Sequence, residues 1–254
     1  MKKNIFSLCF MIVALNVLFT DHSHAQKLNE TVVTFLCDAT DQTVFDAIET
    51  DFRQNLNVFF TNTSIGAINY GQRLTIRMGV IDESDQISLS SKSIAITDKK
   101  VSRKEAERLR NPRPLLKLIN DELSRGKQLS ERKMTSSPII DITLKVFREM
   151  STEARNVVVI CTDGVEYSNY ANFYKNIPST PQSIEKLISK IDSILLDEAK
   201  EQISSADPEV VVVLKPNDKV KRISELKVFY KEFFYQLGVN TIKFIDNLNN
   251  NPNL

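Results

Sequence analysis

Histidine is almost absent from this sequence. Only His22 and His24 occur, and both lie within the first 25 residues, which we predict to be removed as a signal peptide. A mature chain without histidine excludes His-based catalytic triads and His-ligated zinc sites. Gly-rich phosphate loops and nucleophile elbows are missing too. We therefore do not expect an enzyme.

Long apolar runs are missing as well, except at the N-terminus. Lys2 and Lys3 precede an apolar run from Ile5 to Phe19, and Ser23-His24-Ala25 offers small residues at the positions that a signal peptidase reads. The run is too short for a comfortable membrane span. We expect residues 1–25 to be the signal peptide of an exported bacterial protein, periplasmic or secreted, with no membrane span after cleavage. An uncleaved anchor is the alternative.

The chain carries no excess charge of either sign. It has 33 Lys and Arg against 32 Asp and Glu, and removal of residues 1–25 leaves 31 of each. This balance argues against a nucleic-acid partner, because phosphate binding needs a basic excess. One segment departs from it: Lys99 to Lys133 holds twelve basic and five acidic side chains. We predict an elaborated basic helical connection at residues 99–135, which is either a solvated face or a contact for an acidic partner.

Cysteine is too scarce for a disulfide framework. Outside the signal segment only Cys37 and Cys161 remain, each near the end of an apolar strand-like run. We interpret both as small buried core residues.

Strand-like and helix-like segments alternate along the rest of the chain. Apolar, β-branched or alternating runs predict strands at Thr31–Cys37, Leu74–Ile81, Ser88–Thr97, Asn156–Cys161, Glu209–Leu214 and Val239–Ile245. Helical spacing of apolar residues predicts helices at Thr43–Leu56, around Leu115–Leu123, at Pro138–Met150, from Pro181 through Ile203, and at Leu226–Leu237. This order predicts one α/β domain over residues 26–246, with a doubly wound, mostly parallel central sheet of Rossmann type and helices on both faces. Residues 247–254 are expected to be a disordered tail.

Local signals define some helix ends. Ser137 followed by Pro138 predicts an N-cap, and Thr180 followed by Pro181 predicts another. Gly238 fits the position just beyond the end of a helix.

Polar side chains follow two of the predicted strands. The first strand ends in Asp38-Ala39-Thr40-Asp41-Gln42, and Asn156–Cys161 is followed by Thr162-Asp163-Gly164. Because ligands of open α/β sheets bind beyond the carboxyl ends of the strands, these side chains are expected to converge if the strands are neighbours. Oxygen-only ligands suit a hard cation such as Mg²⁺, Ca²⁺ or Mn²⁺.

These segments resemble the von Willebrand factor A family, whose first strand ends in Asp-x-Ser-x-Ser, whose later helix-opening loop supplies Thr, and whose central strand ends in Asp-Gly. The resemblance covers nearly all of residues 30–245 and implies a metal-ion-dependent adhesion site. The implied ligands are Asp38, Thr40, Gln42, Ser137 and Asp163. Gln42 stands where the family has its second Ser, and its amide oxygen sits on a longer side chain. In this hypothesis an acidic side chain of a partner protein completes the coordination of the ion.

The loop after Asp163-Gly164 is rich in tyrosine. We expect Glu166, Tyr167, Tyr170 and Tyr174 to frame the partner surface, because Tyr is favoured at protein interfaces. Local packing of a long loop is the alternative.

Two other functions are compatible with the same residues. The chain could be a metal-free structural or assembly component of the cell envelope, with the basic connection as its contact. The run after Asp38 is also similar to the Asp-x-Asp-x-Thr motif of haloacid dehalogenase-type phosphatases, but Thr40 stands where that chemistry needs a second carboxylate. A phosphatase-type hydrolase is therefore the less favoured hypothesis.

Overall fold

A computed structural model describes residues 29–62, 71–84, 86–96, 111–215 and 222–248. The predicted signal peptide, residues 99–110 of the predicted basic connection and most of the predicted tail lie outside these ranges, so export remains a prediction. No helix in the described ranges has both the length and the apolar character that a membrane span needs.

The described residues form one six-stranded sheet with the order β3-β2-β1-β4-β5-β6. Its strands are β1 (Asn29–Asp38), β2 (Gln72–Ile81), β3 (Ser90–Ile96), β4 (Arg155–Thr162), β5 (Glu209–Leu214) and β6 (Thr241–Ile245). All neighbouring strands are parallel except β3, which pairs antiparallel with β2. β1, β4 and β5 are apolar on both faces because both faces of the central sheet are covered.

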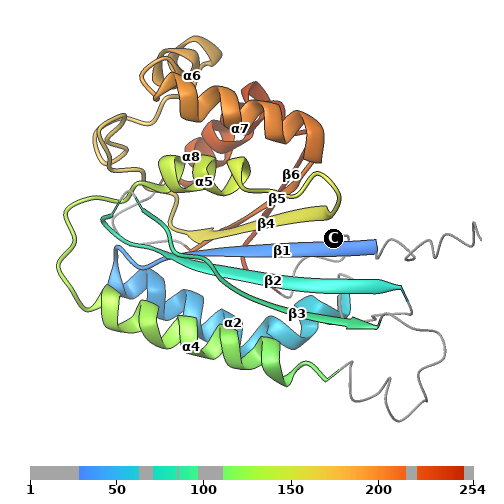
Figure 1. Cartoon of the computed structure of the whole chain (residues 1–254). Helices are drawn as coiled ribbons and strands as arrows, with labels where there is room; N and C mark the ends of the chain where they lie inside the picture. Colours follow the sequence, from blue (N-terminus) through green and yellow to red (C-terminus); the bar gives the residue numbers. More distant parts are fainter. Residues whose placement is uncertain (1–28, 63–70, 85, 97–110, 216–221, 249–254) are drawn as a thin grey trace, which may run out of the picture.

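Six helices lie in the described ranges and cover both faces of the sheet (Figure 1). They are α2 (Gln42–Asn62), α4 (Arg113–Ser130), α5 (Ile139–Arg148), α6 (Pro181–Ile188), α7 (Ser193–Ala206) and α8 (Ile223–Gln236). α2 and α4 lie on one face, and α5, α6, α7 and α8 lie on the other. The predicted α/β fold with a mostly parallel sheet is therefore confirmed.

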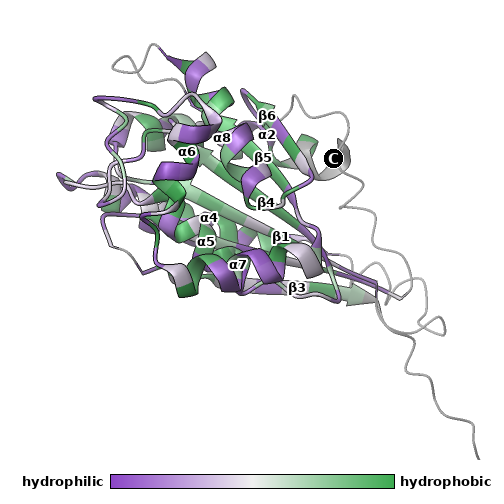
Figure 2. Ribbon diagram, turned by 90° about the horizontal axis from the view of Figure 1, so that it is seen from above, coloured by the Kyte–Doolittle hydropathy of each residue, from purple (hydrophilic) through white to green (hydrophobic). Residues whose placement is uncertain are grey.

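Each face of the sheet has its own hydrophobic core. Leu36, Val158 and Val212 pack under the α5–α8 layer, whereas their strand neighbours Phe35 and Val159 pack under α2 and α4. Figure 2 shows apolar colour along the central strands and a mixture of polar and apolar colour on the helices that cover them. This alternation follows from the two-residue period of a strand.

Cys37 and Cys161 are neighbours in this core. They are register partners on β1 and β4, and both are buried free thiols. The interpretation as core residues is confirmed.

Two predictions about chain segments are wrong. The single helix predicted from Pro181 through Ile203 is two helices. α6 ends at Ile188, and Asp192 starts a new helix as the N-cap of α7, its carboxylate accepting from the Leu195 N–H at 2.9 Å. The tail does not begin at residue 247, because Leu248 is fully buried and its N–H donates to both carboxylate oxygens of Asp51 at 3.1 Å. The cap at Thr180 is confirmed and forms a capping box with Ser183.

Candidate functional site

Asp38 and Thr162 are the last residues of two neighbouring parallel strands, β1 and β4. The Thr162 hydroxyl donates to Asp38 Oδ2 at 2.7 Å. Asp38 Oδ1 accepts from the Thr40 amide at 3.0 Å and from the Thr40 hydroxyl at 2.6 Å. The predicted convergence of the two strand ends is therefore present, and it is held by side chains.

The Asp38 carboxyl is only 1% exposed. Burial raises its pKa above the usual value, and the hydrogen bonds from Thr40 and Thr162 act in the opposite direction. Neutralising this buried carboxylate requires either a proton or a nearby positive charge.

Asp163 follows β4 in a tight turn. Its side chain is 6% exposed, and its Oδ1 accepts from the Val165 amide at 2.9 Å. Gly164 adopts the left-handed conformation with φ of +80°, donates its N–H to the Thr162 hydroxyl at 2.9 Å and accepts from the Tyr230 hydroxyl at 3.1 Å. A side chain at position 164 would be strained, which explains why the turn uses glycine. The turn therefore holds Asp163 beside the Asp38–Thr162 pair.

Ser137 is not the N-cap that the sequence predicts. The N-cap of α5 is Pro138, and no side chain caps this helix. Ser137 is extended, because its N–H donates to the Tyr167 carbonyl at 2.7 Å and its carbonyl accepts from the Tyr167 N–H at 3.1 Å. Ser137 Oγ is buried, and no hydrogen-bond partner for it lies within the described residues.

Gln42 begins α2 and is exposed. No hydrogen bond in the described part of the chain joins its side chain to Asp38, Ser137 or Asp163. The helix is capped instead by Asp41, whose Oδ1 accepts from the amides of Thr43 at 2.9 Å and Val44 at 3.3 Å. Gln42 therefore makes no hydrogen bond to the cluster of Asp38, Thr40 and Thr162 within the described residues.

Glu166 does not lie on the predicted partner surface, because it is fully buried. Its Oε2 accepts from the Ile140 amide at 2.9 Å in the first turn of α5, whereas Oε1 has no hydrogen-bond partner within the described ranges. Burial raises the pKa of Glu166 to about 8. The Glu166 carboxyl thus satisfies a backbone N–H at the start of α5, as the side chain of a helix N-cap would, and it points inward because that N–H is buried.

The three tyrosines of the loop have different surroundings. Tyr167 and Tyr174 are 41% and 52% exposed, and their rings meet edge to face with centroids 6.2 Å apart. Partial burial, followed by the nearby charges of Asp163, Asp41 and Asp38, raises the pKa of Tyr174 to about 12. Tyr170 is half-buried, and its hydroxyl donates to Asp141 Oδ1 at 3.2 Å. Only Tyr167 and Tyr174 therefore present an exposed aromatic surface beside the carboxylates.

A recess of about 270 Å³ lies beside Tyr167. Its walls come from the loop after β2 at Glu83, from Thr135, Ser136 and Pro138 before α5, and from Ser168 and Asn169. The Thr135 amide and hydroxyl donate to Glu83 Oε2 at 3.2 and 3.1 Å, and so join the segment before α5 to the loop after β2.

The rim, by which we mean Asp38, Thr40, Ser137 and Asp163, offers oxygen donors alone. Within the described ranges no three His, Cys, Asp or Glu side chains gather as a metal site. Two carboxylates with two hydroxyls, Asp38, Asp163, Thr40 and Ser137, suit Mg²⁺ better than Ca²⁺, because Mg²⁺ keeps several waters and needs only one or two carboxylates. The partnerless Ser137 hydroxyl is a donor that this arrangement would use.

Two residues of the site were missed by the sequence analysis as functional positions. Thr162 was recognised only as part of the Thr-Asp-Gly ending, although its place at the end of a strand next to β1 aims it at Asp38. Asp141, which pairs with Lys145 at 2.5 Å and accepts from Tyr170, anchors the tyrosine loop to α5. The four-residue spacing of Asp141 and Lys145 was the available signal for that ion pair.

No protein-family model and no curated protein matches the sequence. Among solved structures, the chain is similar to the human COPII-coat protein Sec24c, with a TM-score of 0.39 and 11% sequence identity. The alignment covers 85% of this chain and 29% of that chain, so this chain spans less than a third of that protein's length. At this level the similarity carries no argument about binding or activity.

Proposed function

We propose that this chain is a binding module of the doubly wound, von Willebrand factor A type, which contacts a protein partner through a divalent cation held at the rim of Asp38, Thr40, Ser137 and Asp163. The observation that carries the proposal is the buried Ser137 hydroxyl, which has no partner in the described ranges. The Ser137 backbone pairs with Tyr167, four residues after the buried Asp163 carboxylate. An unsatisfied buried hydroxyl costs about 1–3 kcal/mol, so its retention favours a ligand.

The rim residues would contribute two kinds of ligand to such an ion. The carboxylates of Asp38 and Asp163 would supply negative charge, and the hydroxyls of Thr40 and Ser137 would complete the oxygen set. The ion would supply a positive charge at an otherwise acidic rim. It would keep coordination positions open to water or to a carboxylate of the partner.

Tyr167 and Tyr174 would form the partner-facing surface around the ion. Both are exposed and their rings contact one another, and Tyr167 lines the recess of about 270 Å³. Tyrosine gives a large contact area with little loss of conformational freedom, which suits a surface that recognises a protein.

A metal-free structural or assembly component is the second candidate function. Asp38 favours it, because its carboxylate already accepts three hydrogen bonds from Thr40 and Thr162 and does not require an ion for satisfaction. The exposed position of Gln42 points the same way, because it removes a ligand that the family motif would provide.

Thermal unfolding with and without divalent cation separates the two candidates. A ligand that binds only the folded state at a hundredfold excess over its Kd adds about 2.7 kcal/mol. For a chain of this size that raises Tm by roughly 5–10 °C. We expect this rise with millimolar Mg²⁺ or Mn²⁺, its loss in Asp38→Ala, and its retention in Asp197→Ala, a control in which an exposed carboxylate on α7 is removed. A wild-type Tm that does not move with Mg²⁺, Mn²⁺ or Ca²⁺ would contradict the ion and leave the metal-free candidate.

A further inference from the structure

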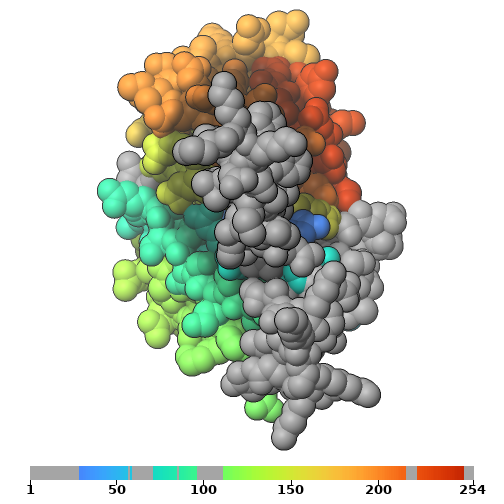
Figure 3. Space-filling view, turned by 45° about the vertical axis from the view of Figure 1, so that its right-hand side comes forward, coloured from blue at the N-terminus to red at the C-terminus, as the bar shows by residue number. Residues whose placement is uncertain are grey.

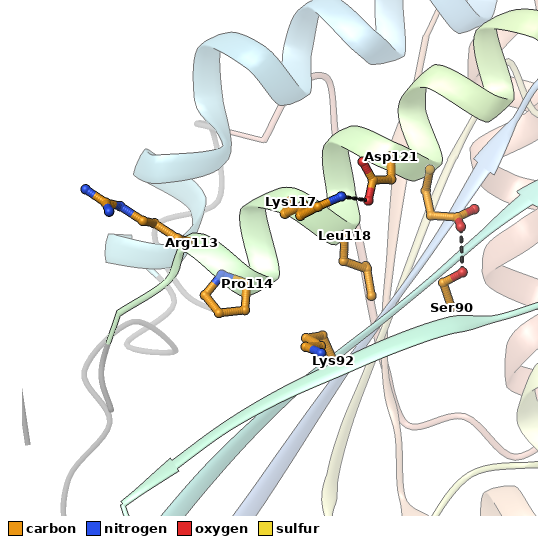
Figure 4. Close-up of a pocket in the computed structure, with 8 residues that line it drawn as sticks. Ser90, Lys92, Arg113, Pro114, Lys117, Leu118 and Asp121 are labelled. Atoms are coloured by element: carbon orange, nitrogen blue, oxygen red, sulfur yellow. Dashed lines mark hydrogen bonds and ion pairs between the residues drawn. The ribbon is translucent and has the colours of Figure 1, made fainter. Parts of the chain in front are cut away.

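A groove of about 760 Å³ lies between β3 and α4, apart from the rim (Figure 4). β3 contributes Ser90 and Lys92, and α4 contributes Arg113, Pro114, Lys117 and Leu118. Pro114 and Leu118 give the groove an apolar part, and Lys92 lies opposite them on β3 (Figure 4). Arg113 stands at the start of α4, at one end of the groove.

The walls of the groove are fixed by contacts at its inner end. The Ser90 hydroxyl donates to Glu122 Oε1 at 2.5 Å, which joins β3 to α4 directly. Farther along α4, Gly126 packs against the ring of Phe45, where a Cβ would overlap the ring. α4 is therefore held between α2 and β3, and the groove is formed before any ligand arrives.

The carboxylates that line the groove are already paired. Asp121 pairs with Lys117 at 2.6 Å, and Glu122 pairs with Arg125 at 2.7 Å. No carboxylate of the described ranges pairs with Lys92 or Arg113, which are both exposed. The groove therefore has a surplus of positive charge.

The neighbouring sequence does not neutralise this surplus. Residues 97–110, which join β3 to α4, carry six Lys and Arg against three Asp and Glu. Charge complementarity therefore favours an acidic occupant that comes from another molecule.

β3 is also the outermost strand of the sheet on this side, within the described residues. Figure 3 shows the surface of β2 and β3 in teal, between the green surface of α4 and the orange and red α6–α8 layer. An edge strand presents unpaired backbone N–H and C=O groups, which an extended peptide can use by adding a strand.

We propose that the β3–α4 groove binds an extended acidic segment of a partner protein, which pairs with the backbone of β3 and places carboxylates against Lys92 and Arg113. A nucleic acid fits less well, because the chain has 33 Lys and Arg against 32 Asp and Glu, and phosphate binding needs a basic excess. A membrane surface fits less well, because the site is concave and apolar at Pro114 and Leu118 rather than flat and uniformly basic. The proposal does not depend on the ion at the rim.

Fluorescence anisotropy with the full chain tests this proposal. The probe is a labelled eight-residue peptide that alternates Glu and Val, and the comparison peptide carries Lys in place of Glu. We expect the acidic peptide to bind, the basic peptide not to bind, and higher salt to weaken the complex. Replacing alternate Val by Pro should also abolish binding, because proline removes backbone donors for the strand pairing.

Charge reversal locates the site. The double variant Lys92→Glu/Arg113→Glu is expected to weaken binding about tenfold, because each exposed ion pair contributes up to about 1 kcal/mol. Lys231→Glu is the control, since Lys231 is exposed on α8 in the opposite layer. The affinity of this variant for the acidic peptide should stay within about twofold of the wild-type affinity. Far-UV circular dichroism and Tm verify that the variants fold.

Three results would overturn the proposal. The first is no binding of the acidic peptide to the wild-type chain at millimolar concentration. The second is binding that the double reversal leaves unchanged. The third is tighter binding of single-stranded DNA, or of vesicles made from equal parts of phosphatidylcholine and phosphatidylglycerol, that the same reversal abolishes.

Discussion

The Thr162 hydroxyl donates to Asp38 Oδ2 at 2.7 Å and so joins the ends of β4 and β1. The same hydroxyl accepts from the Gly164 amide at 2.9 Å. One side chain therefore orients the buried Asp38 carboxylate and also fixes the turn that carries Asp163. The geometry of the rim depends on Thr162 more than on any flexible loop side chain.

Thr162→Val removes this hydroxyl with little change in shape. A hydrogen bond to a charged group contributes about 1.5–3 kcal/mol, and the buried partners would be left unsatisfied. We expect the free energy of unfolding, measured by urea denaturation, to fall by roughly 2–4 kcal/mol. Thr152→Val is the control, because Thr152 is exposed, and its effect should stay within about 0.5 kcal/mol. Equal effects of the two substitutions would show that the Thr162 hydroxyl is not structurally important.

Ser137→Ala should have the opposite effect in metal-free buffer. Ser137 Oγ is buried and has no partner in the described ranges, so removing it relieves a desolvation cost. The metal-free variant is expected to be as stable as wild type or more stable by about 1 kcal/mol. A clear loss of stability in a chelator-treated sample would mean that the hydroxyl has a structural partner.

Glu166 predicts a specific dependence of stability on pH. Its pKa rises from 4.5 to about 8 on folding, because burial disfavours the charged form. The unfolded chain therefore releases this proton near pH 4.5 while the folded chain keeps it, and stability is lost as pH rises towards 8. The loss at pH 7 is on the order of 3 kcal/mol. The raised pKa of Asp38 acts in the same direction.

Glu166→Gln should flatten this profile without abolishing it. Urea unfolding between pH 5 and 8 is the measurement, and Glu201→Gln, at an exposed position on α7, is the control. We expect the Gln variant to be at least as stable as wild type at pH 8. A variant that keeps the full wild-type slope would show that Glu166 is ionised in the folded chain.

The spacing of apolar residues along the sequence predicted the buried strands and the amphipathic helices. β5 begins at Glu209 and ends at Leu214 as predicted, because a run of four valines and a leucine between Glu209 and Lys215 is typical of a buried strand in a parallel sheet. Gly238 lies just beyond the C-cap Leu237 of α8, as predicted, and its φ of +96° is one that glycine adopts without strain.

Tertiary contacts decided what the sequence did not predict. Ser137 is a residue type that favours helix N-caps, but its backbone pairing with Tyr167 holds it outside α5. The Glu166 carboxylate instead accepts a hydrogen bond from the Ile140 amide in the first turn of that helix. Glu166 lies in a polar loop, and no local pattern marks it as buried. Leu248 was assigned to a frayed tail because only its contact with Asp51, 197 residues away, shows that it is anchored.

The contact of Leu248 with Asp51 leads to a truncation test. Asp51 also pairs with buried Lys215 at 2.6 Å, and Lys215 donates to the Asp246 carbonyl at 2.7 Å. Removing residues 249–254 should leave Tm nearly unchanged. Removing residues 247–254 should cost about 2–3 kcal/mol, because it exposes the Leu248 site and removes a donor to Asp51. Equal Tm values for the two truncations would contradict the anchoring role of Leu248.

The most direct test of the central claim is a count of bound Mn²⁺ by electron paramagnetic resonance of the free ion. We expect one Mn²⁺ per wild-type chain, displaced by Mg²⁺, with affinity reduced about tenfold or more in Ser137→Ala and unchanged in Asp197→Ala. No bound Mn²⁺ on the wild-type chain, or the same affinity in Ser137→Ala, would contradict the ion-binding rim.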